Sequence, residues 1–305
     1  MSFGEFATNW RDTVMPSHKL STQSMEKNHI NRYLIPYFGE MDMGDIAPVH
    51  LQRFIAGLTL NPKTVRNIIG TFRLIWKTAK SWGTVTHNAC DGIVLPRKKP
   101  PKRRCFSLEE IQRIIAAAEE PYRTIYWLAA ETGLRAGEIT GLRVCDVDTR
   151  HHTVQVRQSV WKGRVQTPKS TSALRTLAVS KALADALERH CAGGGDPLRF
   201  VFSTRNGTPL DGHDIVFQKL QPLLERLGIE PGGLHAFRHA NATLLVSRGV
   251  DIRTAATRLG HADPSLTLRV YAHAIREKDR EVADQMGTIL CPLVPTVEAE
   301  VVAGV

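Results

Sequence analysis

The sequence contains few of the residues that build disulfide frameworks or zinc sites. Its 305 residues include five cysteines, Cys90, Cys105, Cys145, Cys191 and Cys291. They are odd in number, scattered along the chain and without a C-x-x-C pair, which argues against both kinds of site. This use of cysteine is typical of a reducing cytoplasm.

Long hydrophobic runs and metal-binding signatures are also missing. No apolar stretch approaches the ~18 residues that a membrane-spanning helix needs. The first ten residues lack the basic and apolar regions of a signal peptide. We find no Asp-x-Asp-like cluster, no His-Glu-x-x-His motif and no internal repeat. We therefore expect a cytoplasmic protein without a bound metal.

Positive charge is concentrated in one short stretch. The formal net charge is +10 and the pI is about 9.6. Residues 1–96 hold ten basic and seven acidic residues, residues 105–305 hold 24 and 23, and residues 97–104 hold six and none. Prolines at positions 96, 100 and 101 and the repulsion between like charges predict an extended linker between two domains. The basic balance favours a polyanionic partner.

The segment before the linker has the pattern of a small all-α domain. Apolar residues recur every three or four positions in three segments, which predicts helices over 21–38, 46–58 and 61–82. Asn61-Pro62 is a typical helix start, and Gly39 and Gly83 are typical helix ends.

The segment after the linker mixes helices with a few strands. Ser107 and Glu110 form a capping box, and a second helix is predicted over 121–132, ended by Gly133. Strands are predicted over 153–159, 165–167 and 175–179, with a turn at Lys162-Gly163. Helices follow over 181–191, 211–227, 235–248, 251–259 and 265–286. The predicted fold class is mainly α with a small antiparallel β-sheet, an α+β arrangement.

Four segments of the second domain carry groups suited to phosphodiester transfer. That reaction needs a nucleophile, donors for the charge on the non-bridging oxygens and an acid for the leaving oxygen. Arginine suits the donor role because its planar fork stays charged and binds two phosphate oxygens. The segments are Glu131-Thr-Gly-Leu-Arg-Ala-Gly-Glu138, Thr167-Pro-Lys-Ser170, Leu234-His-Ala-Phe-Arg-His239 and Leu259-Gly-His-Ala-Asp-Pro-Ser-Leu-Thr-Leu-Arg-Val-Tyr-Ala-His273.

Taken singly, each of these residues is better explained as a surface or packing residue, Tyr271 included. In this order, however, the segments resemble the tyrosine recombinases, the family of phage integrases and Xer-type resolvases. The family pattern is an arginine in T-G-L-R-x-G-E, a β-hairpin lysine, H-x-x-R, L-G-H, and a tyrosine nine or ten residues after that histidine. Every element is present, and by motif the resemblance covers roughly residues 105–290.

The resemblance implies that the protein cuts and rejoins DNA without ATP, metal or another cofactor. Tyr271 attacks the scissile phosphate and forms a 3′-phosphotyrosyl bond. Arg135 and Arg238 bind the non-bridging oxygens, and Lys169 protonates the leaving 5′ oxygen. The resemblance thus assigns the nucleophile, the phosphate donors and the acid to named positions.

Three further residues take supporting roles by the same resemblance. His235 assists proton transfer at the tyrosine, and His261 hydrogen-bonds the phosphate. Glu138 either orients the site or is simply an acidic residue near a helix N-terminus, where the helix dipole favours it.

The resemblance also implies a domain plan and an assembly. Residues 1–96 form a SAM-like core-binding domain, 97–104 the linker, 105–290 the catalytic domain and 291–305 a tail. The protein works as a homotetramer on two DNA duplexes through a Holliday junction at the nucleoid, and a C-terminal segment docks in trans. The apolar residues Ile289, Leu290 and Leu293 are the expected docking patch. Phosphate contacts are expected from Arg97, Lys98, Lys99, Lys102, Arg103 and Arg104.

Two alternatives remain open on sequence grounds. A type IB topoisomerase uses similar chemistry to relax supercoils without synapsis of two sites. A DNA-binding protein on the same scaffold would bind DNA without cutting it. The short linker, the L-G-H segment and the N-terminal helices favour a recombinase over the topoisomerase, and the intact residue set argues against loss of cleavage.

Overall fold

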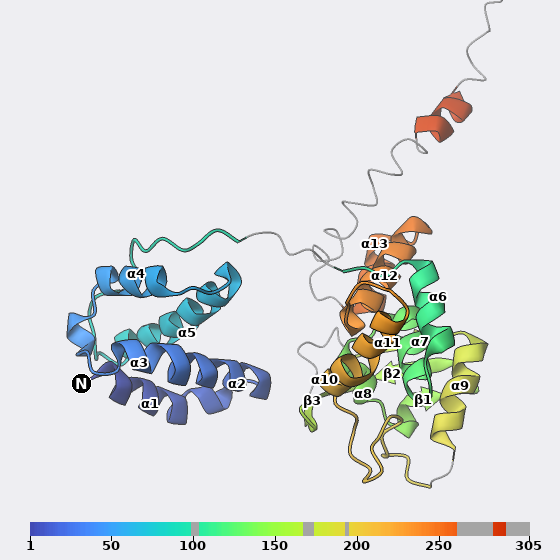
Figure 1. Ribbon diagram of the computed structural model, residues 1–305, viewed down its shortest axis with the longest axis horizontal. Helices are drawn as coiled ribbons and strands as arrows, with labels where there is room; N and C mark the ends of the chain where they lie inside the picture. The colour runs from blue at the N-terminus through green and yellow to red at the C-terminus, as the bar shows by residue number, and fades with distance from the viewer. Residues whose placement is uncertain (99–103, 167–173, 193–194, 261–282, 291–305) are drawn as a thin grey trace, which may run out of the picture. The chain divides into compact units, whose positions relative to one another are not determined.

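The computed structural model describes residues 1–98, 104–166, 174–192, 195–260 and 283–290. The chain divides into two compact units, Met1–Lys102 and Arg103–Val305, each drawn in Figure 1. Each unit has a hydrophobic core of its own. The basic stretch 97–104 spans the boundary between the units.

The N-terminal unit is all α, as predicted. Its helices are α1 (Phe3–Thr13), α2 (Leu20–His29), α3 (Ile35–Phe38), α4 (Pro48–Gly57) and α5 (Pro62–Ser81), with a π-helical turn over Ile30–Leu34 that joins α2 to α3. The three predicted helices are confirmed to within a few residues of their ends. Asn61 caps α5 by accepting a hydrogen bond from the Lys63 N–H at 2.9 Å.

Helix α1 is not among the predicted elements, although its signals are present. Ser2 and Glu5 form a capping box at its start. Phe3, Phe6 and Trp10 have helical spacing and are buried in the core of the unit. The ring of Phe3 stacks on Phe72 of α5 at 5.4 Å between centroids. The first helix therefore belongs to the same core as the three that were predicted.

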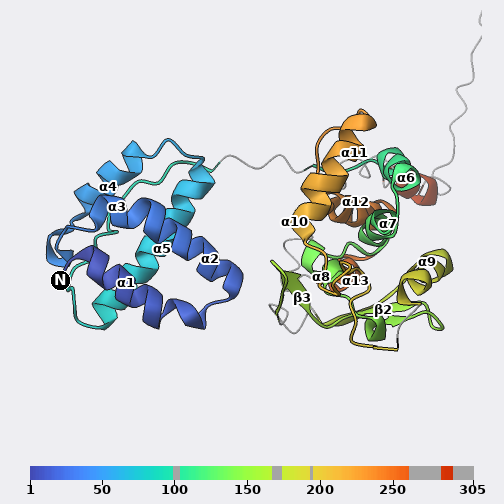
Figure 2. The same cartoon turned by 60° about the horizontal axis from the view of Figure 1, so that its bottom comes forward.

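Helices dominate the C-terminal unit as well. In chain order they are α6 (Leu108–Ala117), α7 (Tyr122–Thr132), α8 (Ala136–Thr140), α9 (Lys181–Cys191), α10 (Gly212–Asp214), α11 (Gln221–Arg226), α12 (Leu234–Ser247) and α13 (Ile252–Leu259). A π-helical turn over Ile215–Leu220 makes α10 and α11 one continuous helix, as predicted for 211–227. Figures 1 and 2 show α7 beside α12, and these two helices pack closely at the centre of the unit.

The strands form two small antiparallel sheets. Strands β1 (Val147–Asp148), β2 (Thr153–Val156) and β5 (Arg175–Ala178) form one sheet in the order β1-β2-β5, with Val154 opposite Leu177. Strands β3 (Ser159–Trp161) and β4 (Arg164–Gln166) form a separate hairpin. Its turn at Lys162-Gly163 is confirmed, and both residues have positive φ, as two-residue hairpin turns of this kind require.

The predicted single strand over 153–159 is wrong, because the chain leaves the first sheet after Val156. Gln158 donates a hydrogen bond to the Gly141 carbonyl at 2.8 Å, and Arg157 pairs with the buried Asp146 at 3.3 Å. These contacts turn the chain so that β3 packs on α8 instead of continuing β2. Tertiary contacts have overridden the local strand pattern.

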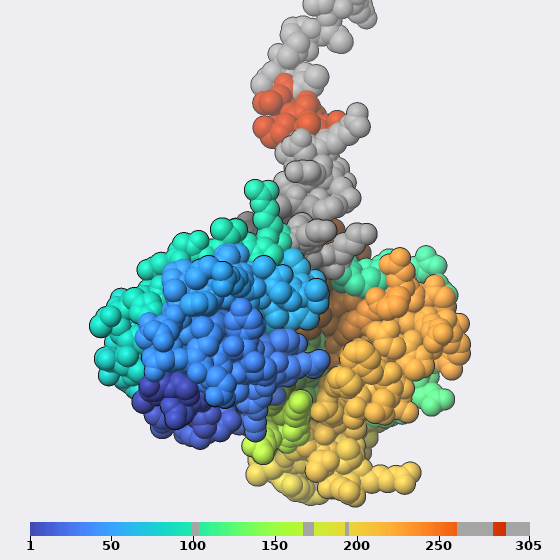
Figure 3. Space-filling view, turned by 60° about the vertical axis from the view of Figure 1, so that its left-hand side comes forward, coloured from blue at the N-terminus to red at the C-terminus, as the bar shows by residue number. Residues whose placement is uncertain are grey.

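Two other predictions fall partly outside the described residues. Residues 265–282 of the predicted helix 265–286 are not described, whereas residues 283–290 are helical. Thr167 of the strand 165–167 is not described either. Within the described ranges, no helix has both the length and the apolar character to cross a membrane. In Figure 3, one face of the C-terminal unit is formed largely by the yellow-to-orange region from α9 to α11.

Candidate active site

Arg135 lies where α7 gives way to α8. Helix α7 ends at Gly133, which adopts the left-handed conformation with φ of 67°. Glycine adopts this conformation without strain, and a Cβ at Gly133 would also displace Leu259, whose Cδ2 would lie 2.6 Å away. Arg135 follows at the N-cap of α8, and its backbone N–H donates to Glu138 Oε2 at 3.0 Å.

The second glycine of the same motif serves packing. A Cβ at Gly137 would lie 2.6 Å from the Val160 carbonyl oxygen of β3. Strand β3 therefore packs directly on the backbone of α8. The T-G-L-R-A-G-E spacing thus places Arg135 between two glycines, one in the left-handed conformation and one in close contact with the backbone of β3.

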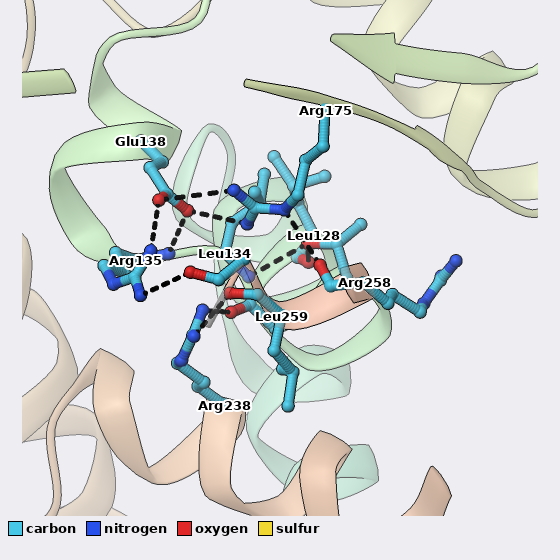
Figure 4. A network of polar contacts seen from close by, with 11 residues as sticks. Leu128, Leu134, Arg135, Glu138, Arg175, Arg238, Arg258 and Leu259 are labelled. Atoms are coloured by element: carbon cyan, nitrogen blue, oxygen red, sulfur yellow. Dashed lines mark hydrogen bonds and ion pairs between the residues drawn. The ribbon is translucent and has the colours of Figure 1, made fainter. Parts of the chain in front are cut away.

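Glu138 is a buried carboxylate between two arginines, as Figure 4 shows. Arg135 Nη1 lies 2.6 Å from Glu138 Oε1, and Arg175 Nη2 lies 2.9 Å from Glu138 Oε2. Burial alone would raise the pKa of this carboxyl, but hydrogen bonds and charge from Arg175 and Arg135 outweigh it. The pKa of Glu138 is therefore lowered and the group is ionised at neutral pH.

Arg238 extends from α12 into the same cluster and is only 5% exposed. Its Nη1 donates to the Gly133 carbonyl at 2.6 Å and its Nη2 to the Leu259 carbonyl at 2.5 Å. Burial, followed by repulsion from Arg135, lowers the pKa of the guanidinium to about 9. Arg238 still carries its charge at neutral pH, and a buried cation of this kind favours an anionic ligand.

His235 stands one turn before Arg238 on α12, with its side chain exposed to solvent. Neighbouring protein atoms displace part of the water around the imidazole, which lowers its pKa. The positive charges of Arg238 and Arg135 lower the pKa further. The ring is therefore mainly neutral at pH 7 and able to accept a proton. The ring of His239 lies 6.4 Å from that of His235 between centroids.

The last residues of α13 bring the arginines together. The carbonyls of Arg258, Leu259 and Gly260 accept hydrogen bonds from three different arginines. The donors are Arg175 Nε at 2.9 Å, Arg238 Nη2 at 2.5 Å and Arg135 Nη2 at 3.1 Å, in that order along the helix. Figure 4 shows Arg135, Arg175 and Arg238 around the labelled Arg258 and Leu259.

Two arginines of this cluster, Arg175 and Arg258, were not predicted as site residues. Arg175 starts β5 with a side chain only 5% exposed, and Arg258 Nη2 donates to the carbonyls of Glu131 and Ala178 at 3.2 and 3.1 Å. One signal for Arg175 was present in the sequence. Arg175 and Leu177 are two positions apart on a predicted strand, so their side chains lie on the same face, which is the buried one.

Three predicted site residues, Lys169, His261 and Tyr271, lie outside the described residues. Lys169 falls in the gap between Gln166 of β4 and Leu174 just before β5, and His261 and Tyr271 fall in the gap that follows Gly260. Both breaks adjoin the cluster, because Arg175 is near the start of the resumed strand and Gly260 carries a carbonyl bound to Arg135. The structure thus describes Arg135, Glu138, His235 and Arg238 of the predicted set, and brings all four to one place.

Of the six linker residues predicted to contact phosphates, three are described by the structure and three are not. Arg97 and Lys98 are exposed, whereas Lys99, Lys102 and Arg103 are outside the described residues. Arg104 is partly buried, pairs with Glu110 at 2.6 Å and lies over the Phe106 ring at 4.9 Å. Its guanidinium thus contributes to the fold of the C-terminal unit. In the described part of the chain, no group of three or more histidine, cysteine or acidic residues is placed to hold a metal ion.

Family models match both units of this chain. The model of the phage integrase family matches residues 104–278, and the model of the phage integrase N-terminal SAM-like domain matches residues 2–59. Among individual relatives, the putative prophage phiRv2 integrase of Mycobacterium tuberculosis is 27% identical over 292 residues, covering 92% of this chain and 76% of that protein. The ICEBs1 integrase of Bacillus subtilis is 28% identical, covering 87% and 77%.

Solved structures share the fold. The Tn1549 transposon integrase in complex with a circular intermediate DNA superimposes with a TM-score of 0.77 at 18% identity, covering 94% of this chain and 99% of that one. A lambda integrase dimer bound to a COC′ core site gives 0.71 at 16% identity, covering 89% and 95%. Because the family model spans more than half of the sequence, the chain belongs to the phage integrase family and is a site-specific tyrosine recombinase.

Proposed function

We propose that this recombinase cleaves and rejoins DNA through a 3′-phosphotyrosyl bond to Tyr271. One observation carries the proposal. Arg135 and Arg238, from α8 and α12, donate to the carbonyls of the consecutive residues Gly260 and Leu259. Two guanidiniums held this close together are able to bind the non-bridging oxygens of a single phosphate.

The strand-cleavage step follows from the groups assigned. The phenolic oxygen of Tyr271 attacks the phosphorus, the bond from phosphorus to the 5′ oxygen breaks, and Lys169 donates a proton to that oxygen. His235 accepts the proton of the tyrosine, and His261 hydrogen-bonds the phosphate. Attack by the 5′ hydroxyl of a second strand reverses these steps and releases the tyrosine.

The electrostatics of the described residues support this assignment. A lowered pKa keeps His235 neutral near pH 7, as a proton acceptor must be. Glu138 forms ion pairs with Arg135 and Arg175, so its negative charge is already neutralised in the protein without DNA. Its role in the proposal is to orient Arg135, since a carboxylate in contact with the phosphate would repel it.

The two units take separate tasks in the proposal. Residues 1–96 bind the core of the recombination site, residues 97–104 cross the phosphate backbone, and residues 105–290 carry the chemistry. A homotetramer holds two duplexes during strand exchange. Residues 291–305 and the apolar end of the preceding segment, where Ile289 is 67% and Leu290 is 54% exposed, link the protomers.

The test is capture of the covalent intermediate. The purified chain is incubated with a library of duplexes whose central positions are randomised. Each duplex carries a nick, so that the short strand beyond the cut diffuses away and cleavage cannot be reversed. Protein-linked DNA is recovered under denaturing conditions and sequenced, and the enriched sequence becomes a defined substrate. We expect an adduct with the wild type and none with Tyr271→Phe.

Two outcomes would contradict the proposal. Absence of any wild-type adduct would leave a DNA-binding protein that does not cut. Relaxation of a supercoiled plasmid that lacks the enriched site, at the same rate as one that contains it, would favour a topoisomerase.

A further inference from the structure

The C-terminal end of α13 is capped by side chains from three other elements. The carbonyls of residues 258, 259 and 260 accept from arginines on β5, α12 and α8 respectively. The last carbonyls of a helix have no partner within the helix, and they form the negative end of its dipole. Three guanidiniums satisfy both needs at once.

Arg175 is the member of this group that also reaches the buried carboxylate. Its Nε donates to the Arg258 carbonyl at 2.9 Å, while its Nη2 lies 2.9 Å from Glu138 Oε2. One rigid guanidinium therefore fixes the end of α13 relative to α8. A lysine at this position would offer a single flexible ammonium group instead of a fork.

The backbone around Arg175 is shaped to admit it. Gly260 adopts the left-handed conformation with φ of 63°, and a Cβ there would lie 2.6 Å from Arg175 Nη1. Gly260 is the last described residue before the segment that contains His261 and Tyr271. Arg175 therefore holds the point from which that segment departs.

We propose that Arg175 is a positioning residue for DNA cleavage. Its Nη2 binds Glu138 Oε2 at 2.9 Å and its Nη1 lies 3.4 Å from Oε1, so Arg175 fixes the carboxylate. Glu138 Oε1 in turn holds Arg135, whose Nη2 meets the Gly260 carbonyl. Without Arg175, Glu138 keeps only its contacts with the backbone N–H and the Nη1 of Arg135, so the carboxylate and the arginine that it holds are less firmly placed. The proposal rests on the proposed function, because it assigns Arg135 to phosphate binding.

The experiment compares Arg175→Gln and Arg175→Lys with a matched control. Arg199→Gln removes an arginine that also caps a helix, since Arg199 Nη2 donates to the carbonyls of His190 and Cys191 at the end of α9. For each variant, the rate of covalent adduct formation at saturating DNA, the Kd for DNA and the Tm are measured. A positioning role predicts a slower rate with an unchanged Kd.

We expect Arg175→Gln to slow adduct formation by about tenfold to a hundredfold, as small displacements of reacting groups do. Arg175→Lys should recover part of the rate, and Arg199→Gln should lower the Tm without slowing cleavage. In a Glu138→Gln background, Arg175→Gln should slow cleavage by less than about threefold, because the two residues act through one contact. If Arg175→Gln does not fold, the comparison rests on Arg175→Lys.

Three results would overturn the inference. These are an Arg175 variant that cleaves at the wild-type rate, an Arg199→Gln protein that loses as much cleavage rate for the same fall in Tm, and fully multiplicative effects in the double variant. The failure of the proposed function is distinguishable, because then the wild type itself forms no adduct.

Discussion

Arg238 Nη2 donates to the carbonyl oxygen of Leu259 at 2.5 Å, and this bond joins the middle of the C-terminal unit to the end of α13. The other terminal nitrogen, Nη1, donates to the Gly133 carbonyl at 2.6 Å. One buried side chain thus connects the ends of α7 and α13. The geometry gives Arg238 a structural role in addition to the phosphate contact proposed for it.

Replacement of Arg238 is therefore expected to affect cleavage and stability together. Arg238→Gln should slow adduct formation by about a hundredfold or more, as loss of one charge-stabilising donor does. It should also lower the free energy of unfolding by about 1–3 kcal/mol, because buried carbonyls are left without their partners. Urea unfolding and the adduct assay measure the two effects. A stable Arg238→Gln protein with normal cleavage would refute both roles.

Gly260→Ala tests the close approach at the end of α13. Gly249, with φ of 77°, also follows a helix but has open space where a Cβ would lie, so Gly249→Ala is the matched control. Both alanines incur a cost of about 1–2 kcal/mol for the left-handed backbone. Only Gly260→Ala adds a clash with Arg175, so it should unfold more easily and cleave more slowly. Equal unfolding free energies for the two variants would contradict this.

The pKa of His235, the proposed proton acceptor, can be measured by titration of the protein without DNA. Desolvation by the surrounding protein atoms and the charges of Arg238 and Arg135 lower the pKa of His235, so its NMR signals should titrate below the ordinary value of 6.5. Arg135→Gln should move this pKa upward. Because the folded state disfavours the charged ring, His235 contributes stability above pH 6.5, which is lost as the pH falls through its lowered pKa. The same acid-induced loss in His235→Gln would exclude this contribution.

The linker prediction can be tested through salt dependence. Replacing Arg97, Lys98, Lys99, Lys102 and Arg103 with glutamine should weaken DNA binding and flatten the plot of log K against log salt, by about 0.9 for each phosphate that the linker no longer neutralises. Arg104→Gln serves as the contrast, because Arg104 is paired with Glu110 and stacked on Phe106. It should change stability more than the salt slope. An unchanged slope in the fivefold variant would remove the linker from the DNA interface.

Deletion of residues 287–305 tests the assembly. It removes Ile289 and Leu290, which are exposed in the described segment. Removal of this apolar surface should weaken formation of the tetramer on two duplexes while sparing adduct formation at a single site. Light scattering with and without DNA reports the assembly, and unchanged tetramer formation would count against a docking role.

Local signals were enough for most helices. Asn61 at a helix start, Gly133 at a helix end and the Ser107–Glu110 capping box act within a few residues, so the sequence predicts them directly. The split between β2 and β3 was not predictable in this way. It depends on contacts of Arg157 and Gln158 with residues that only the folded chain brings near them.

The sequence by itself determined the family, the order of the reactive groups and the concentration of positive charge between two domains. Tertiary structure decided how the charges are balanced. Glu138 accepts from Arg135 and Arg175, and the partners at the end of α13 lie 125, 83 and 21 positions away in the chain. No local periodicity encodes contacts over such separations, because they form only when α8, α12 and β5 pack around the same helix end.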